Sequence, residues 1–466
     1  FHILWVNQMF FPRLALPLSL VCQLLFSGVL HASDVTLSLS EAKNRLATHS
    51  WKLKAQAADV QAWQYQANAL DALDLPQLGF TVSAIAYEKE LNLTSPLLPA
   101  PVATDIYKSG LRSTVDMMWP LYVGGRIEAS QQQILARVAE SEAAKQQVSQ
   151  QLEQRVLDLY FGQQFAVEVL KVRQQAEQTL AQHLHRAQRF EAQGQINQLN
   201  RMQAEVALAQ GKRERLRAKR QLEDVAAALQ NVLVSRESFC LSTALPQPKA
   251  LPESPGWYVR QALASNPALS QLHAKQHQAD QQLAIEQSKF MPEVFLAGSY
   301  DLNKHATPLT EPDWKLGLGV RWAITSSTDR RQMIASASTK STETGFLIEQ
   351  ARSELQQGVE SSYRAVQQQL EQFELLQQDV ALAQRHAELQ QKAFSNGLVT
   401  SLDVTDSQLK HTSAQLQLLQ SAYGYVSAYS QLLLYSGQLS QFEQLLAPVS
   451  STALCSGVKD ITNATH

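Results

Sequence analysis

The chain has 466 residues, of which 45% are hydrophobic and 18% are charged, and its formal net charge at pH 7 is -2. A charge so close to zero gives no indication of a nucleic-acid partner or of a strongly charged surface. The length suits two or three ordinary domains, yet the chain holds only 18 glycines and 16 prolines and is rich in Gln, Ala and Leu. We therefore expect most of it to be helical.

Residues 1–32 have the pattern of a secretory signal peptide. Arg13 precedes the apolar run 14–30, and the small residue Ala32 comes directly before an expected cleavage point. Met9 is the expected start of translation. The alternative is a transmembrane anchor, which the polar residues inside the run disfavour. The sequence thus predicts an exported protein.

The three cysteines bear on export and on cross-linking. Cys22 lies in the signal-like segment and lacks the small preceding residue of a lipidated cysteine, so a lipoprotein is not expected. Cys240 and Cys455 would remain in an exported protein, where two thiols can persist as a disulfide. The sequence alone does not choose between that disulfide and two unpaired thiols.

An alternating stretch from Asp313 to Trp322 indicates a β-strand with one apolar and one polar face. Its apolar face consists of every second residue: Trp314, Leu316, Leu318, Val320 and Trp322. About ten alternating residues with Trp at both ends are typical of a tilted strand that crosses a bilayer in a barrel, whereas a helix would need roughly 20 apolar residues. A partner strand begins at Glu293, so a hairpin is predicted over 293–322.

A second pair of strands is predicted upstream, in a hairpin over 77–119 with a Pro-rich loop near 90–105. Its apolar positions are Leu78, Phe80, Val82, Ala84 and Ala86, followed by Leu111, Val115, Met117 and Trp119. A sheet in lipid has to close, because an open edge leaves backbone groups unpaired, and membrane barrels have at least about eight strands. Four strands per chain therefore predict an oligomer.

Each hairpin is followed by a very long helix. Residues 126–193 contain no proline and carry an apolar stripe among Gln, Glu and Arg, and a helix of this length approaches roughly 100 Å at 1.5 Å per residue. After a turn, residues 200–234 return as an antiparallel helix. Residues 329–396 and 401–436 show the same pattern. The polar, Gln-rich faces suit a water-filled conduit.

The two halves of the chain align without a gap. Trp119 and Trp322 lie 203 residues apart (322 − 119 = 203), and Gly194 and Gly397 have the same offset (397 − 194 = 203). This regularity predicts a tandem duplication. The expected parts are a first repeat over 33–240, a Pro-rich linker over 241–256, a second repeat over 257–440 and a tail over 441–466.

Two motifs carry a resemblance to a known family. Residues 394–408, FSNGLVTSLDVTDSQ, resemble the second helix-turn-helix signature of the TolC-type outer-membrane efflux protein family, and residues 119–126, WPLYVGGR, resemble its strand-to-helix joint. The resemblance covers nearly all of the chain after residue 32. It implies a homotrimer whose twelve strands form a β-barrel in the outer membrane of a Gram-negative bacterium, with a helical barrel in the periplasm.

The same resemblance implies a function. The chain would be the passive exit channel of a tripartite efflux or type I secretion system, with no cofactor, no metal and no enzyme activity. Its implied partners are a periplasmic adaptor (membrane fusion protein) and an inner-membrane transporter. The competing class is a secreted coiled-coil scaffold or adhesin, which would have no use for four strands of bilayer length.

The resemblance also assigns residues at the helical turns. Asp403 and Asp406 match acidic residues that ring the periplasmic aperture in this family. Because they are three positions apart, they share a helix face, and a trimer would gather them around one axis as a cation site. Alternatively, both simply favour the positive end of the helix dipole. The turn residues expected to contact an adaptor are Gly194, Leu199, Asn200, Gly397, Leu398 and Val399.

Three further groups of residues stand out in the sequence. We expect an aromatic girdle at the membrane surfaces, formed by Trp119, Tyr122, Trp314 and Trp322. His273 and His277 are four apart on a helix but have no evident third ligand, so no metal site is predicted. A basic run on the first return helix is either a solvated face or a docking surface for an acidic adaptor: Lys212, Arg213, Arg215, Arg217, Lys219 and Arg220.

Overall fold

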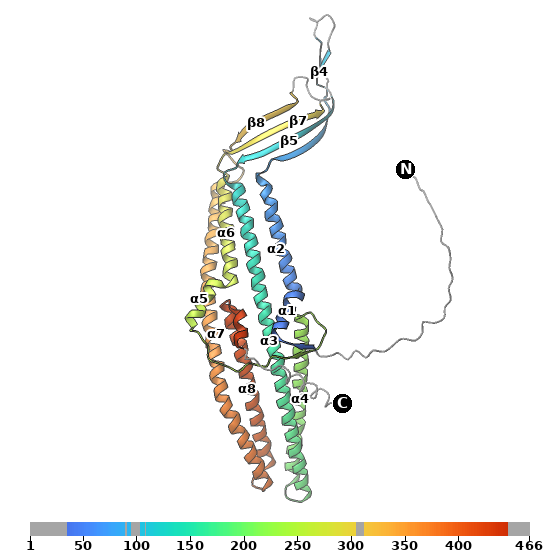
Figure 1. Ribbon diagram of the computed structural model, residues 1–466, viewed down its shortest axis with the longest axis vertical. Coiled ribbons are helices and arrows are strands. Elements are labelled where there is room, and N and C mark those ends of the chain that lie inside the picture. The colour runs from blue at the N-terminus through green and yellow to red at the C-terminus, as the bar shows by residue number, and fades with distance from the viewer. Residues whose placement is uncertain (1–34, 89–90, 95–102, 108, 304–311, 446–466) are drawn as a thin grey trace, which may run out of the picture.

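The computed structural model describes residues 35–88, 91–94, 103–107, 109–303 and 312–445. Two helices, α3 (Arg126–Ala192) and α7 (Arg330–Ser395), run from a β-sheet at one end of the molecule to a pair of turns at the other (Figure 1). The 67 residues of α3 span roughly 100 Å. The predicted mainly helical fold with a small β part is therefore confirmed.

Shorter helices pack along α3 and α7 in two tiers. Toward the sheet, α2 (Trp51–Leu70) packs against α3, and α6 (Pro267–Ser288) packs against both long helices. Toward the turns, α4 (Gln198–Val232) packs against α3, and α8 (Ser401–Tyr435) packs against both long helices. The layer therefore runs α2-α3-α6-α7 near the sheet and α4-α3-α8-α7 near the turns. In both tiers α7 lies at one edge, and α2 or α4 lies at the other.

The predicted duplication is visible in the helix bounds. The return helices α4 and α8 both have 35 residues, and their first residues keep the predicted offset (401 − 198 = 203). The start of α6 also follows the sequence pattern, because the side chain of Asn266 accepts a hydrogen bond from the Ala268 amide at 2.9 Å and Pro267 occupies the first helical position.

The membrane-type strands form one antiparallel sheet in the order β2-β5-β7-β8. Their bounds are Gln77–Ile85 for β2, Gly110–Tyr122 for β5, Glu293–Asn303 for β7 and Trp314–Arg321 for β8. Both predicted hairpins are present, and β5 pairs with β7 to join them. Because residues opposite each other in antiparallel strands share a face, one apolar row crosses the sheet: Phe80, Val115, Tyr300 and Trp314.

The two faces of this sheet differ in chemistry. The apolar face is open in the single chain, with Leu318 exposed to 68% and Val320 to 67%. The other face carries ion pairs, among them Arg112 with Asp301 at 2.9 Å. A soluble sheet would bury an apolar face of this size, so the face requires an apolar partner.

A compact group of short elements surrounds the middle of the helical layer (Figure 1). It contains a parallel pair of short strands, two short helices and a 3-10 helix: β1 (Val35–Leu37), β6 (Phe239–Leu241), α1 (Leu39–His49), α5 (Pro255–Ser265) and η2 (Leu439–Leu445). The hydroxyl of Tyr160 donates to the Leu37 carbonyl at 2.8 Å and accepts from the Thr243 amide at 3.0 Å. This buried hydroxyl joins α3 to β1 and to the segment that follows β6.

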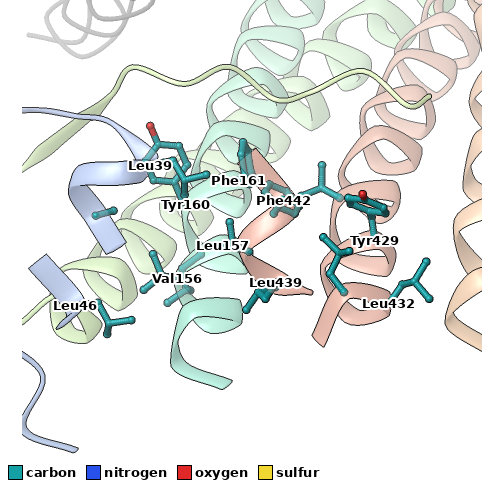
Figure 2. Close-up of a cluster of buried hydrophobic side chains, with 14 of the residues drawn as sticks. Leu39, Leu46, Val156, Leu157, Tyr160, Phe161, Tyr429, Leu432, Leu439 and Phe442 are labelled. Carbon is teal, nitrogen blue, oxygen red and sulfur yellow. The ribbon is translucent and has the colours of Figure 1, made fainter. Parts of the chain in front are cut away.

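The main hydrophobic core lies at the same level. Figure 2 shows side chains of α3, α8 and η2 that converge there: Val156, Leu157, Tyr160, Phe161, Tyr429, Leu432, Leu439 and Phe442. Phe161 is fully buried and lies 5.7 Å from Phe442 between ring centroids. Because this core joins residues of both repeats, it holds the two halves of the chain together.

Four features of the fold differ from the sequence prediction. Residues 39–73 have a continuous helical pattern in the sequence, but the helix is divided at Ser50. The Ser50 amide donates to the Leu46 carbonyl, and its hydroxyl accepts from the Leu53 amide. A 3-10 turn, η1 (Asp71–Asp74), completes the segment. The strands β1 and β6 and the helix α5 were not predicted. The region predicted as a loop contains the paired strands β3 (Leu91–Thr94) and β4 (Ala103–Tyr107).

Among the helices that the structure describes, none combines the length and the apolar composition that crossing a membrane requires.

Candidate functional site

The site predicted from the sequence lies at the turn end of the molecule, where α3 is joined to α4 and α7 to α8 (Figure 1). The two turns have the same backbone geometry, because Gly194 and Gly397 both have φ of +70°. A Cβ atom built on either glycine would meet nothing within 4 Å. The left-handed backbone, rather than lack of space, therefore explains glycine at both positions.

Replacing Gly397 by alanine is expected to destabilise the protein by roughly 1–2 kcal/mol, because an L side chain disfavours this φ. Gly345, inside α7, is the control: its Cβ would meet only the Gln276 side chain at 3.9 Å, so Gly345→Ala should stabilise by roughly 0.5–1 kcal/mol. Thermal unfolding of the two variants measures both effects. An unchanged unfolding temperature in Gly397→Ala would contradict this explanation of the turn.

Asp403 belongs to the start of α8. Its carboxylate accepts hydrogen bonds from the Thr400 amide at 2.8 Å and the Thr400 hydroxyl at 2.6 Å, while its own amide donates to that hydroxyl. These bonds favour the charged carboxylate, so the pKa of Asp403 lies below its ordinary value. Asp403 is thus part of a reciprocal helix cap at the start of α8, a local role beside the helix-dipole alternative that the sequence left open.

Asp406 lies one turn further along α8 and is exposed like Asp403. Its carboxylate forms an ion pair with Lys410 at 2.8 Å, and both side chains face solvent. In the single chain each acidic group therefore has a local partner. The acidic ring itself, which requires three chains, stays a prediction.

Asn200 connects the two turns. Its side-chain oxygen accepts a hydrogen bond from the Ser401 amide at 3.1 Å, so the start of α4 is bonded to the start of α8. The predicted adaptor-contact residues differ in exposure: Leu199 and Leu398 are strongly exposed, whereas Val399 is half-buried. The turn end thus presents leucines outward and keeps a polar link between the repeats inside.

His183 is a buried residue of the turn end that the sequence analysis missed. Its Nε2 lies 2.8 Å from the hydroxyl of Ser401, and its ring lies edge-on to Phe394 at 4.9 Å. The Nδ1 atom is buried without a hydrogen-bond partner. Burial, and secondly the nearby charge of Arg186, lower the pKa of His183 from 6.5 to about 4, so the ring is neutral at physiological pH.

A partly open cavity of about 820 Å³ lies beside this contact, between α3, α4, α7 and α8. Arg186 of α3 donates to Gln391 of α7 at 2.8 Å. Several residues that line the cavity have buried polar atoms without a hydrogen-bond partner. They include Arg186, Gln391, Gln408 and His411. Burial also lowers the pKa of His411. Polar groups of this kind favour water over an apolar occupant.

Two of the predicted girdle residues occupy equivalent places in the repeats. The indole of Trp119 donates to the Asp74 carbonyl at 2.8 Å, and that of Trp322 donates to the Phe290 carbonyl at 3.1 Å. Both lie where the sheet meets the helices. Trp314 lies on the same apolar face near the other end of the sheet, opposite Tyr300. An amphipathic ring at each end of an apolar face suits the two surfaces of a bilayer.

The remaining predicted residues have these positions. Cys240 lies in β6 and is disulfide-bonded, while Cys455 lies outside the described residues. The pairing of these two cysteines stays a prediction. His277 contacts Gln281 at 3.3 Å. In the described part of the chain, no group of three or more His, Cys, Asp or Glu side chains is arranged to hold a metal ion.

Comparisons with known proteins agree with this architecture. The family model described as outer membrane efflux protein matches residues 43–234 and again residues 258–438. No curated protein matches the chain significantly. The matching solved structures include CusC, with a TM-score of 0.74 and 17% identity over 86% of this chain and 92% of that one.

Two further structures show the same fold. VceC from Vibrio cholerae has a TM-score of 0.71 and 16% identity over 86% of this chain and 96% of that one. The CmeC channel from Campylobacter jejuni has a TM-score of 0.71 and 12% identity over 91% of this chain and 89% of that one.

The duplicated helical hairpins, the sheet with one open apolar face and the paired turns define an outer-membrane channel protein. The chain belongs to the outer membrane efflux protein family, whose model covers both repeats. Its function is that of an outer-membrane efflux channel, and the family is one of transport channels. The alternative of a secreted scaffold or adhesin has no support in these comparisons.

Proposed function

We propose that three copies of the chain form a closed, passive duct across the outer membrane and the periplasm of a Gram-negative bacterium. The observation that carries the proposal is the pair of unpaired sheet edges, at β2 and at β8, in the part of the chain that the structure describes. In lipid an unpaired edge costs several kcal/mol for each backbone group. Three copies of a four-stranded sheet give twelve strands, enough to close a barrel.

The helical layer supports the same arrangement. Its edges coincide with those of the sheet: α2 and α4 lie on the side that begins with β2, and α7 lies on the side that ends with β8. When β8 of one copy pairs with β2 of the next, α7 comes beside the next copy's α2 and α4. A ring closed by one repeated contact has cyclic symmetry.

The chemistry of the two sheet faces decides which face of the barrel contacts lipid and which contacts water. The apolar face around Leu318 contacts lipid, and the face with the Arg112–Asp301 pair lines the water-filled interior. The turn end then lies in the periplasm, away from the membrane. There the exposed Leu199 and Leu398 are available to a periplasmic adaptor, which links the duct to an inner-membrane transporter.

The mass of the native assembly in mild detergent tests this proposal. A trimer of about 150 kDa is expected, because one chain has a mass of 51.8 kDa. A population of folded monomers or dimers with no trimer would contradict it.

The proposed aperture yields a prediction for cation block. In the trimer, Asp403 and Asp406 place six carboxylates near one axis, and such a ring binds divalent cations. Replacing both residues by asparagine should weaken divalent-cation block of single-channel current by about tenfold or more. Lys410→Gln is the control, because it removes only the exposed partner of Asp406. Unchanged block in the double variant would reject the acidic ring without rejecting the channel.

A further inference from the structure

The basic run of α4 belongs to a longer stripe along the free edge of the helical layer. Starting from the turn end, the stripe begins with two exposed apolar residues four positions apart, Met202 and Val206. It continues at the same helical spacing with three arginines: Arg213, Arg217 and Arg220. The stripe is therefore apolar near the turns and basic further up. We call these five residues the α4 stripe.

The opposite edge of the layer carries a matching stripe on α7. Leu375, Leu382 and Leu389 are seven residues apart, so they share one face of the helix, and all three are more than half exposed. Asp379 and Glu371 lie on the same face, each four residues from Leu375, and both are exposed. We call these five residues the α7 stripe. Exposed leucines at heptad spacing are typical of a helix that packs against a partner.

The heights of the two stripes can be compared within one chain. Arg215 of α4 forms an ion pair with Glu177 of α3, which fixes the level of the basic run on α3. Arg186 of α3 is bonded to Gln391 of α7 (391 − 186 = 205), and the last residues of the two helices are 203 positions apart (395 − 192 = 203). Residues 203 to 205 positions apart therefore lie at about one level. On this scale Glu177 lies level with α7 between Val380 (177 + 203 = 380) and Leu382 (177 + 205 = 382), within three residues of Asp379.

A rotation about the channel axis leaves every height unchanged. We propose that the α4 stripe of one chain packs against the α7 stripe of the next, an inference that rests on the proposed trimer and adds its register. Val206 then lies beside Leu389 of the neighbour. Arg217 lies level with the neighbour's Asp379, Arg213 lies about one helical turn closer to the turn end, and Arg220 lies on the side of the neighbour's Glu371.

The charges of the two stripes explain why α4 of one chain pairs with α7 of the next, and not with another α4. Within the described residues, Arg213, Asp379 and Glu371 form no ion pair. Arg217 and Arg220 form ion pairs only with glutamates of their own helix, Glu214 and Glu223. Contact between two α4 stripes would bring arginines together, and contact between two α7 stripes would bring carboxylates together. Only the α4-to-α7 contact pairs opposite charges, so the stripes favour a head-to-tail ring over a two-fold dimer.

Paired cysteines test the register directly. The double variant Val206→Cys/Leu389→Cys should form cross-linked dimers and trimers under mild oxidation, detected on a denaturing gel without reductant. The control Val206→Cys/Leu375→Cys moves one cysteine along the same face by roughly 20 Å and should not cross-link. Single variants control for the native cysteines. Equal cross-linking in both double variants, or none in either, would overturn the proposed register.

Charge reversal tests the basic half of the stripe. Arg213→Glu/Arg217→Glu should reduce the trimer fraction in detergent by about tenfold, and adding Asp379→Arg should restore at least part of it. Lys212→Glu is the control, because Lys212 is exposed but lies about 100° around the helix from Arg213. If the wild type is trimeric and the reversals change nothing, the proposed seam is wrong but the trimer stands. If the wild type itself is not trimeric, the proposed function fails first.

Discussion

Replacing Leu318 by arginine is expected to abolish stable insertion into the outer membrane. Leu318 lies in β8 on the apolar face, opposite Leu296 of β7, and is 68% exposed in the single chain. An arginine on the lipid face near the middle of a membrane strand costs roughly 2–4 kcal/mol, and a trimer carries three copies. Fractionation of the outer membrane, followed by detection of heat-resistant oligomer, measures the loss.

The neighbouring residue supplies a matched control. Gly317 lies on the same strand at nearly the same depth, but on the polar face, and a Cβ atom there would meet nothing within 4 Å. Gly317→Arg therefore adds the same side chain toward water and should insert normally. If both variants insert equally well, the apolar face does not contact lipid, and the assignment of the two faces is wrong.

Acid is expected to weaken the turn end through His183. Its pKa is about 4 in the folded protein and 6.5 when unperturbed, so the unfolded chain binds more protons between these two values. Stability is therefore fully present above about pH 6.5 and falls as the pH drops toward about 4. The gap between the two pKa values corresponds to roughly 3 kcal/mol at most.

Thermal unfolding between about pH 7 and pH 4.5 can isolate this contribution. His183→Phe should flatten the pH dependence, because the new ring cannot titrate and can still pack against Phe394. His185→Gln is the control, since His185 is exposed two positions along the same helix. His411 has a pKa shifted in the same direction and remains in both variants. A pH profile that His183→Phe leaves unchanged would show that this imidazole is not the titrating group.

The large elements could be predicted because their signals are long and regular. Period-two alternation is enough to identify β7 and β8, and the constant offset between Trp119 and Trp322 is enough to identify the duplication. The same offset places the turn glycines, which share one backbone conformation. Long segments without proline predict both α3 and α7.

The features that escaped prediction are short or depend on tertiary contacts. Ser50 divides a helix through hydrogen bonds that any serine could make, and neither glycine nor proline marks the break. Strands of three residues, such as β1 and β6, show no periodicity. His183 looks like any polar residue of a Gln-rich helix, and only its burial against Ser401 and Phe394 distinguishes it.

The hydrogen bond between the two turns is another feature that only the folded structure shows. The sequence alone leaves a link between the two turns in doubt, because nothing in the pattern around Asn200 indicates a partner in the other repeat. The neutral side-chain oxygen of Asn200 nevertheless accepts the Ser401 amide, and a hydrogen bond therefore joins the two repeats without a charge.

Single-channel recording tests the central claim most directly. The purified protein, reconstituted in a planar lipid bilayer, should produce discrete conductance steps without nucleotide or any other energy source, as a passive trimeric duct requires. Recording from trimers isolated by size gives the cleanest result. The contrary result is a folded, membrane-inserted trimer that leaves the bilayer conductance unchanged at any divalent-cation concentration. If the Asp403/Asp406 double variant also leaves the conductance unchanged, the proposed duct is contradicted.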